Sequence, residues 1–262
     1  MKLKIYQIDA FTNEIYKGNS AAVVILDKKL DEKTMQNIAI ENNLSETAFI
    51  QQIDNNRYTI RWFSPICEID FCGHATLSAS FVIFDVSNID KIYFETLKVG
   101  VFEIYKQEDN YIKMVLPNTK PTIVNEVPSI FKQALSIQPK EVLLNNQAYC
   151  LIYENEEDIY NIKLDLELLK ELKPYDVVIS AKSNKYDFVS RYFWPANGGD
   201  EDPVTGSIHT ALAPYWSEKL NKNQLIAYQA SKRGGVLKCE VCDDNVILLG
   251  QAVKYMDGYI YI

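Results

Sequence analysis

Short runs in which apolar and polar residues alternate make up much of the chain, and this period of two predicts β-strands. The amino-terminal half has such runs at residues 2–9, 21–26, 47–52, 58–63, 92–96, 101–105 and 111–116. The carboxy-terminal half has them near 142–145, 149–153, 176–180 and 187–193, and further strands are expected to close the chain. The fold is therefore expected to be dominated by strands.

Helical patterns interrupt these strands at a few places. Residues 30–42 have apolar residues at helical spacing, with Asp31 near the start and Met35, Ile38 and Ala39 on the side expected to be buried. Shorter helices are expected near 129–135 and 165–172. Residues 75–84 and 208–219 are apolar on most sides, which predicts two helices that are buried within the protein.

The chain is expected to consist of two similar halves. Residues 117–128 contain three prolines and few periodic positions, so they are the best candidate for a boundary. We expect a first half at 1–117, to which the last strand (about 252–262) crosses over, and a second half at 118–262. The active site is expected in the cleft between them. Gly73 and Gly206, just before the two apolar helices, are separated by about half the chain, which suggests a duplicated arrangement.

Composition narrows the class of protein. The chain has 262 residues, 47% of them hydrophobic and 24% charged, as in an ordinary globular protein. Its net charge of −8 argues against binding to nucleic acid, but it does not argue against a small anionic substrate. The amino terminus lacks the apolar region of a signal peptide, and the apolar runs are too short to cross a membrane. We therefore expect a cytoplasmic protein.

The five cysteines are expected to be free thiols, because their number is odd and no export signal is evident. Cys239 and Cys242 have the C-x-x-C spacing of redox and zinc sites. The local pattern predicts a strand, however, and residues three apart on a strand point to opposite faces. With two histidines in the chain, no second pair of ligands is evident, so we expect no metal site.

The two glycines that precede the apolar helices are the first candidates for chemistry. The start of a helix presents unpaired N–H groups and a positive dipole end, which favour a carboxylate. Glycine lets a ligand approach this backbone closely. The alternative is that Gly73 and Gly206 only permit tight turns. His74, Asp202 and Ser207 lie beside these glycines, and the alternative role for Asp202 or Ser207 is to cap the helix.

Glu46 is the third candidate, because it lies between the end of a helix and an apolar strand. A lone glutamate at such a place is most often a solvated turn residue. If it instead faces an apolar cleft, loss of water would make it a competent general acid and base. Periodicity leaves both interpretations open.

Together these segments resemble the phenazine biosynthesis PhzF-like family. The resemblance rests on motifs that occur in the family's order across most of the chain: Asp9-Ala-Phe-Thr, Gly18-Asn19, Asn43-Leu-Ser-Glu-Thr-Ala-Phe, Arg61-Trp-Phe-Ser-Pro, Cys72-Gly-His-Ala-Thr-Leu and Glu201-Asp-Pro-Val-Thr-Gly-Ser. One departure is Ser20, which stands where the family usually has proline.

The resemblance implies an α+β protein with the diaminopimelate epimerase-like fold. In that fold two pseudo-symmetric halves each wrap a curved, mostly antiparallel sheet or barrel around a central helix. The resemblance also implies a homodimer without a cofactor, which moves a proton between carbon atoms of a small carboxylate substrate. Glu46 falls on the family's general acid–base position. His74, Asp202 and Ser207 fall on its substrate-holding and proton-relay positions, and Gly73 and Gly206 on its backbone contacts.

Two other functions stay open at this point. Related epimerases and racemases use a cysteine at the position of Cys72 as one of two opposed proton carriers, but no second cysteine occurs near Pro203. Cys72 is then either a small buried residue or a partner of Glu46 in an epimerase. The third function is a binding protein that kept the site and lost the reaction.

Overall fold

The computed structural model describes all 262 residues, and the chain divides into two compact units. Unit 1 comprises Met1–Val115 together with Leu249–Ile262, and unit 2 comprises Leu116–Leu248. Unit 1 is therefore completed by the end of the chain. No helix in the structure has the length and apolar character needed to span a membrane.

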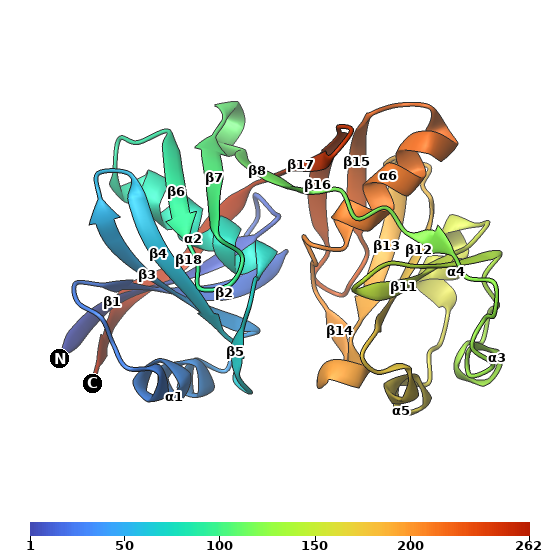
Figure 1. The fold of residues 1–262 in the computed structure, drawn as a ribbon, viewed down its shortest axis with the longest axis horizontal. Coiled ribbons are helices and arrows are strands. Elements are labelled where there is room, and N and C mark those ends of the chain that lie inside the picture. Colours follow the sequence, from blue (N-terminus) through green and yellow to red (C-terminus); the bar gives the residue numbers. More distant parts are fainter. The chain divides into compact units, whose positions relative to one another are not determined.

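Unit 1 is built on a mixed sheet (Figure 1). Its strands are β1 (Lys2–Ala10), β2 (Asn19–Leu26), β3 (Glu46–Asp54), β4 (Arg57–Phe63), β5 (Glu68–Ile69), β6 (Lys91–Glu95), β7 (Val101–Lys106), β8 (Ile112–Pro117) and β18 (Ala252–Tyr261). They pair in the order β18–β1–β2–β3–β4–β6–β7–β8, and the short β5 pairs with the end of β4. The β2–β3 and β4–β6 pairs are parallel and the others antiparallel.

Two helices complete unit 1, together with the 3₁₀ turn η1 (Glu108–Asn110). Helix α1 (Glu32–Asn42) begins after Asp31, whose carboxylate accepts a hydrogen bond from the Thr34 N–H at 2.9 Å. Its buried side chains are the three expected from the sequence. Helix α2 (Gly73–Val86) is buried along most of its length and packs against β1, β2, β3 and β18, which confirms the predicted buried helix.

Unit 2 repeats this plan. Its strands are β9 (Thr122–Ile123), β10 (Glu141–Leu144), β11 (Ala148–Ile152), β12 (Asp176–Lys182), β13 (Phe188–Phe193), β14 (Glu201–Asp202), β15 (Gln224–Gln229), β16 (Gly235–Val241) and β17 (Asn245–Gly250). The helices are α3 (Phe131–Ala134), α4 (Glu156–Asn161), α5 (Leu166–Leu169) and α6 (His209–Leu220), and the 3₁₀ turns are η2 (Lys170–Leu172) and η3 (Pro195–Asn197).

The strand pairings reveal the internal symmetry. In unit 1 the pairs from β1–β2 to β6–β7 are antiparallel, parallel, antiparallel, parallel and antiparallel. The pairs β10–β11, β11–β12, β12–β13, β13–β15 and β15–β16 of unit 2 follow the same sequence. A short strand before the central helix pairs with the end of β4 in unit 1 and of β13 in unit 2. This confirms the predicted pseudo-symmetric halves.

In each unit an equivalent arginine–glutamate ion pair holds the short strand against its neighbour. Arg61 on β4 donates two hydrogen bonds of 2.6 Å to the carboxylate of Glu68 on β5. Arg191 on β13 donates bonds of 2.7 and 2.9 Å to Glu201 on β14. Because a guanidinium and a carboxylate match in shape, such two-bond pairs fix geometry as well as adding energy. The pairs thus hold the short strands that lead into α2 and α6.

The two central helices begin at different distances from the glycines of their motifs. Helix α2 includes Gly73 as its first residue, and α6 begins only at His209, after a turn over residues 206–208. Asp202 and Ser207 do not cap α6, because the residue before it is Ile208 and no side chain caps it. The two polar side chains instead bond within the preceding loop and to a neighbouring strand end, as described below.

Helix α4 was missed by the sequence analysis. It has six residues, three of which are the acidic Glu156, Glu157 and Asp158, and only Ile159 is buried. So short an exposed helix has no apolar period to detect. Helix α5 and η2 together occupy the helix expected at 165–172.

The ion pair of unit 2 gives a testable prediction. We expect Arg191→Met to lower the free energy of unfolding by about 1–3 kcal/mol, because the Arg191 and Glu201 side chains are only 19% and 22% exposed and the carboxylate would lose its partner. Lys170→Met is the control, since it breaks a pair whose side chains are 51% and 81% exposed and should cost less than about 0.5 kcal/mol. Urea unfolding measures both, and equal losses would contradict the structural role of the Arg191 pair.

Candidate active site

Glu46 is positioned by the end of α1 and the start of β3. Helix α1 ends at Asn42, and the next residue, Asn43, has a left-handed backbone conformation (φ 48°) and donates its N–H to the Ala39 carbonyl at 3.1 Å. The chain then turns at once into β3, whose first residue, Glu46, pairs with Ala21 of the parallel strand β2. Its side chain is 13% exposed, so the solvated-turn interpretation is wrong.

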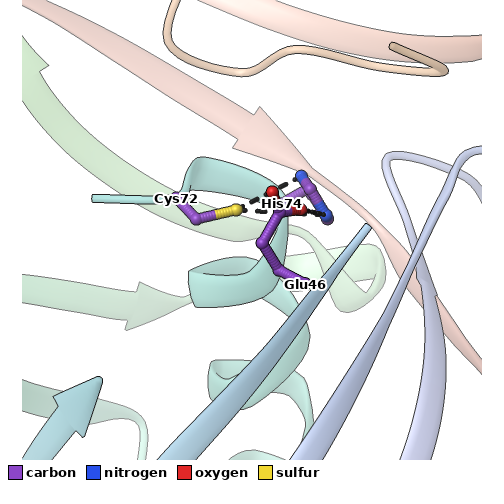
Figure 2. A group of neighbouring side chains, drawn as sticks. All are labelled: Glu46, Cys72 and His74. Atoms are coloured by element: carbon purple, nitrogen blue, oxygen red, sulfur yellow. Dashed lines mark hydrogen bonds and ion pairs between the residues drawn. The ribbon is translucent and has the colours of Figure 1, made fainter. Parts of the chain in front are cut away.

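His74 and Cys72 approach Glu46 from the start of α2 (Figure 2). The His74 Nε2 atom lies 2.9 Å from Oε2 of Glu46, and the imidazole is 6% exposed. The Cys72 Sγ atom lies 3.4 Å from Nδ1 and 3.9 Å from Nε2 of the same ring. Glu46, Cys72 and His74 therefore form one cluster that is largely buried, although they come from two separate segments of the chain.

Asn19 holds the other side of the imidazole. Its Nδ2 atom lies 3.2 Å from Nδ1 of His74, and its Oδ1 atom accepts a hydrogen bond of 3.4 Å from Ser45. The chain reaches this position through Gly18, which has a φ of +63°. A Cβ atom there would stand 2.1 Å from the carbonyl oxygen of Ala10, so only glycine fits.

The charges in this cluster affect one another. Burial, and then the charge of Glu46, raise the pKa of the Cys72 thiol to about 11, so the thiol keeps its hydrogen near neutral pH. Burial works against a charged His74, but the Cys72 sulfur and the Glu46 carboxylate beside the ring outweigh it and raise the pKa of His74 well above its ordinary value. Glu46 contacts Nε2 and is the carboxylate that favours the imidazolium.

The same three residues carry donor types that also occur in metal sites, and their donor atoms all lie within 4.8 Å of one another. The carboxylate contacts Nε2, whereas Sγ lies closer to Nδ1 than to Nε2. The contact between the carboxylate and Nε2 suits proton sharing.

In unit 2, the loop between β14 and α6 carries the other predicted residues. The hydroxyl of Thr205 donates a hydrogen bond to the Asp202 carboxylate. Gln229, which is fully buried, donates to the Asp202 carbonyl at 2.8 Å and accepts from the Thr205 N–H at 2.9 Å. The Ser207 Oγ atom accepts a hydrogen bond of 3.0 Å from the side-chain amide of Gln147. This loop is thus held at both ends.

His209, the second histidine of the chain, belongs to the core of unit 2. Its Nδ1 atom lies 2.8 Å from the Thr205 carbonyl, which can only accept, so the hydrogen is on Nδ1. Burial lowers the pKa of His209 to about 4, although the bond to Thr205 opposes this. A neutral imidazole that supports the loop is a structural element, and no catalytic step is assigned to it.

The structure brings some of the predicted site residues together within each unit. Glu46 contacts His74, and Gly73 is the first residue of the helix that carries His74. Asp202, Gly206 and Ser207 share one loop of unit 2. That all six act on one substrate, in a cleft between the halves, stays a prediction.

Sequence reasoning missed four residues that hold these side chains in place. Asn19 and Thr205 stand inside motifs that were noticed, but their contacts were not foreseen. Gln147 and Gln229 lie just before β11 and at the end of β15, where no motif marks them. Their roles depend on strand register, which the sequence does not state.

Comparison with known proteins connects this site to a family. The family model described as "Phenazine biosynthesis-like protein" matches residues 8–258. A protein of Halalkalibacterium halodurans named as an uncharacterized isomerase is 43% identical, over 98% of this chain and 97% of its own length. The crystal structure of a PhzF-family phenazine biosynthesis protein from Enterococcus faecalis has a TM-score of 0.94 at 40% identity and covers both chains completely.

A more distant likeness concerns the fold alone. The structure of a predicted epimerase from Pseudomonas aeruginosa has a TM-score of 0.77 at 19% identity, over 99% of each chain. The α+β fold with two pseudo-symmetric halves is thus shared with proteins described as epimerases. The match of the family model over nearly the whole chain, and relatives of this identity, establish that the chain belongs to the phenazine biosynthesis-like (PhzF) family.

Proposed function

We propose that this chain is a cofactor-independent isomerase that moves a proton between two carbon atoms of a small carboxylate substrate, with Glu46 as general acid and base. Membership of the family, together with relatives named isomerases, supports the class of enzyme. The observation that carries the proposed chemistry is the buried contact of 2.9 Å between Glu46 and His74. A carboxylate at the surface would be hydrated and a weak catalyst, whereas this one is largely withdrawn from water.

The proposed reaction balances with one proton. Glu46, as the carboxylate, takes a proton from a substrate carbon, and the electron pair left behind moves into a shifted double bond. The same carboxyl group then returns the proton to a second carbon, so that no oxidant or reductant is used. His74 Nε2 stays beside the Glu46 carboxyl group throughout the transfer.

A carboxylate on the substrate has candidate donors in both units. At the start of α2 no side chain caps the first turn, so the N–H groups near Gly73 have no capping partner. In unit 2 the candidates are the backbone at Gly206 and the hydroxyl of Ser207, with Asp202 proposed as a relay. Such donors would also stabilise negative charge that spreads onto the substrate carboxylate during the transfer.

That the enzyme is a homodimer stays a prediction.

An epimerase that uses Cys72 is the second candidate function. The contact of Cys72 Sγ with the His74 ring at 3.4 Å favours it, because an imidazole can accept a thiol proton. Against it stands the pKa of about 11, which keeps the thiol protonated near neutral pH. The position that corresponds to Cys72 before Gly206 is Thr205, which has no thiol. We therefore favour the single-base isomerase.

The role of Glu46 is tested by deuterium incorporation in heavy water, using a panel of unsaturated and cyclic carboxylic acids. For a compound that the wild-type protein labels, Glu46→Gln should slow incorporation by about 100- to 10,000-fold, because the amide cannot accept the proton. Glu41→Gln, at an exposed position of α1, is the matched control and should leave the rate unchanged. Labelling that proceeds at the wild-type rate in Glu46→Gln would remove Glu46 from the mechanism.

The choice between the two functions is tested with Cys72→Ala. The single-base isomerase predicts labelling within about threefold of wild type, since the neutral thiol only fills space beside the ring. A loss of 100-fold or more, with the protein still folded by circular dichroism, would instead support the epimerase. Cys150→Ala, which removes a buried thiol in unit 2, controls for the effect of a small cavity.

The charge of His74 is tested by an NMR titration of the two histidines. We expect the His74 ring to remain protonated well above its ordinary pKa of 6.5, because the Cys72 sulfur and the Glu46 carboxylate beside the ring stabilise the imidazolium. Glu46→Gln removes that charge and should bring the pKa of His74 down. His209 is the internal control, since its ring should stay neutral until the pH falls to about 4 in both proteins. A His74 titration that Glu46→Gln does not move would contradict the coupling.

A further inference from the structure

Unit 2 has a carboxylate at the position that corresponds to Glu46. In unit 1, Glu46 is the first residue of β3 and pairs with Ala21 of the parallel strand β2. In unit 2, Asp176 is the first residue of β12 and pairs with Ala148 of the parallel strand β11. Both strands occupy the same place in the repeated pairing pattern. Neither a sequence motif nor the proposed mechanism uses Asp176.

Asp176 ends a chain of hydrogen bonds that begins at Ser207. The side-chain amide of Gln147 donates to Ser207 Oγ at 3.0 Å and to the Tyr192 hydroxyl oxygen at 2.8 Å. The Tyr192 hydroxyl in turn donates to Oδ2 of Asp176. Oδ1 of Asp176 accepts a bond of 2.7 Å from Asn197. Tyr192 is 3% exposed, so the middle of this chain is closed to solvent.

The direction of each hydrogen bond in this chain follows from the Asp176 carboxylate at its end. Burial, and then the charge of Asp176, raise the pKa of Tyr192 well above its usual value, so the phenol keeps its hydrogen and gives it to the carboxylate. The Tyr192 oxygen can then only accept. Gln147 must therefore turn its NH₂ group, and not its carbonyl oxygen, toward Tyr192, and the second hydrogen of that group goes to Ser207.

The consequence concerns the hydroxyl hydrogen of Ser207. Its oxygen already accepts from Gln147, and within unit 2 the structure gives the hydroxyl hydrogen no acceptor. A buried or half-buried hydroxyl that accepts on one side is set to donate on the other. The loop therefore offers a donor at Ser207 that is fixed in direction before any ligand arrives.

We propose that Gln147 is a positioning residue, which together with Tyr192 and Asp176 holds the Ser207 hydroxyl as a hydrogen-bond donor to the substrate carboxylate. The inference rests on the proposed function for its ligand, a small carboxylate. It also explains why the two corresponding acids differ in their contacts. Glu46 touches the residue after Gly73 directly, whereas two side chains separate Asp176 from the residue after Gly206. Asp176 orients a donor and exchanges no proton with the substrate.

The hydrogen-bond chain is tested without any ligand by NMR of the full-length, ¹⁵N-labelled protein. The side-chain NH₂ hydrogens of Gln147, assigned by their loss in Gln147→Leu, should exchange slowly with solvent. Ser207→Ala and Tyr192→Phe each remove one acceptor and should speed exchange of Gln147 by about tenfold, the loss of one hydrogen bond. Unchanged exchange in both variants, with backbone spectra that show a folded protein, would overturn the chain.

The role in binding is tested by titrating benzoate, with neutral benzamide as the matched ligand, and following the amide signals of Gly206 and Ser207. Gln147→Glu should weaken benzoate at least tenfold, because the new carboxylate accepts the Ser207 hydrogen and repels the ligand, and should leave benzamide within about twofold. Gln147→Leu should weaken benzoate by about three- to tenfold.

Gln138→Leu is the control variant, since Gln138 bonds only to the carbonyls of Phe131 and Leu135, and it should change neither affinity. A structural role for Gln147 would weaken both ligands alike. Benzoate that leaves the Ser207 signal of the wild-type protein unmoved, or that binds Gln147→Glu normally, would overturn the inference.

These outcomes separate the inference from the proposed function. Glu46→Gln should still bind benzoate through Ser207, because Glu46 is proposed to transfer the proton and not to hold the carboxylate. If Glu46→Gln kept full deuterium exchange, the proposed mechanism would fail while the benzoate and amide results would stand. If Gln147→Glu bound benzoate normally while Glu46→Gln lost exchange, the inference alone would fail.

Discussion

The strictest constraint on the structure of unit 1 is that the Glu46 carboxylate and the His74 imidazole share a buried space. Removing an ionised carboxylate from water costs several kcal/mol, and only a close partner of opposite charge offsets that cost. The contact of 2.9 Å between Glu46 and His74 supplies the partner. This contact fixes the local geometry, because the start of β3 and the start of α2 must be placed so that their two side chains touch. Asn19, which follows Gly18, lies against the other nitrogen of the ring, Nδ1.

The repeated architecture explains how one plan yields two different sites. Each unit places an acid at the start of a parallel strand and a polar residue after the glycine that leads into its central helix. In unit 1 these are Glu46 and His74, and they touch. In unit 2 they are Asp176 and Ser207, and two side chains stand between them. The same backbone thus carries the proposed proton carrier in one half and the proposed hydrogen-bond donor in the other, a division that exact symmetry would forbid.

Much of this fold could be predicted from alternation and helical spacing, because the strands are half-buried and α1 carries its apolar residues on one face. The motifs also located Glu46, His74, Asp202 and Ser207. The motifs could not predict which strands pair. That Ala148 lies opposite Asp176 depends on which strands become neighbours, and this is a long-range result of folding. The alternative role of Ser207 as a helix cap was wrong for the same reason, since its hydroxyl oxygen accepts a hydrogen bond from Gln147, sixty residues away in sequence.

The environment of Cys72 bears on the stereochemistry of the reaction. Inversion at a carbon needs one group to remove a proton and another, on the opposite face, to deliver one. Cys72 keeps its own hydrogen near neutral pH, and it lies against the same imidazole that Glu46 contacts. The corresponding Thr205 has already committed its hydroxyl hydrogen to Asp202. If Glu46 is the single proton carrier, as proposed, the proton leaves and returns on one face of the substrate, which suits the shift of a double bond and does not give the inversion that racemisation needs.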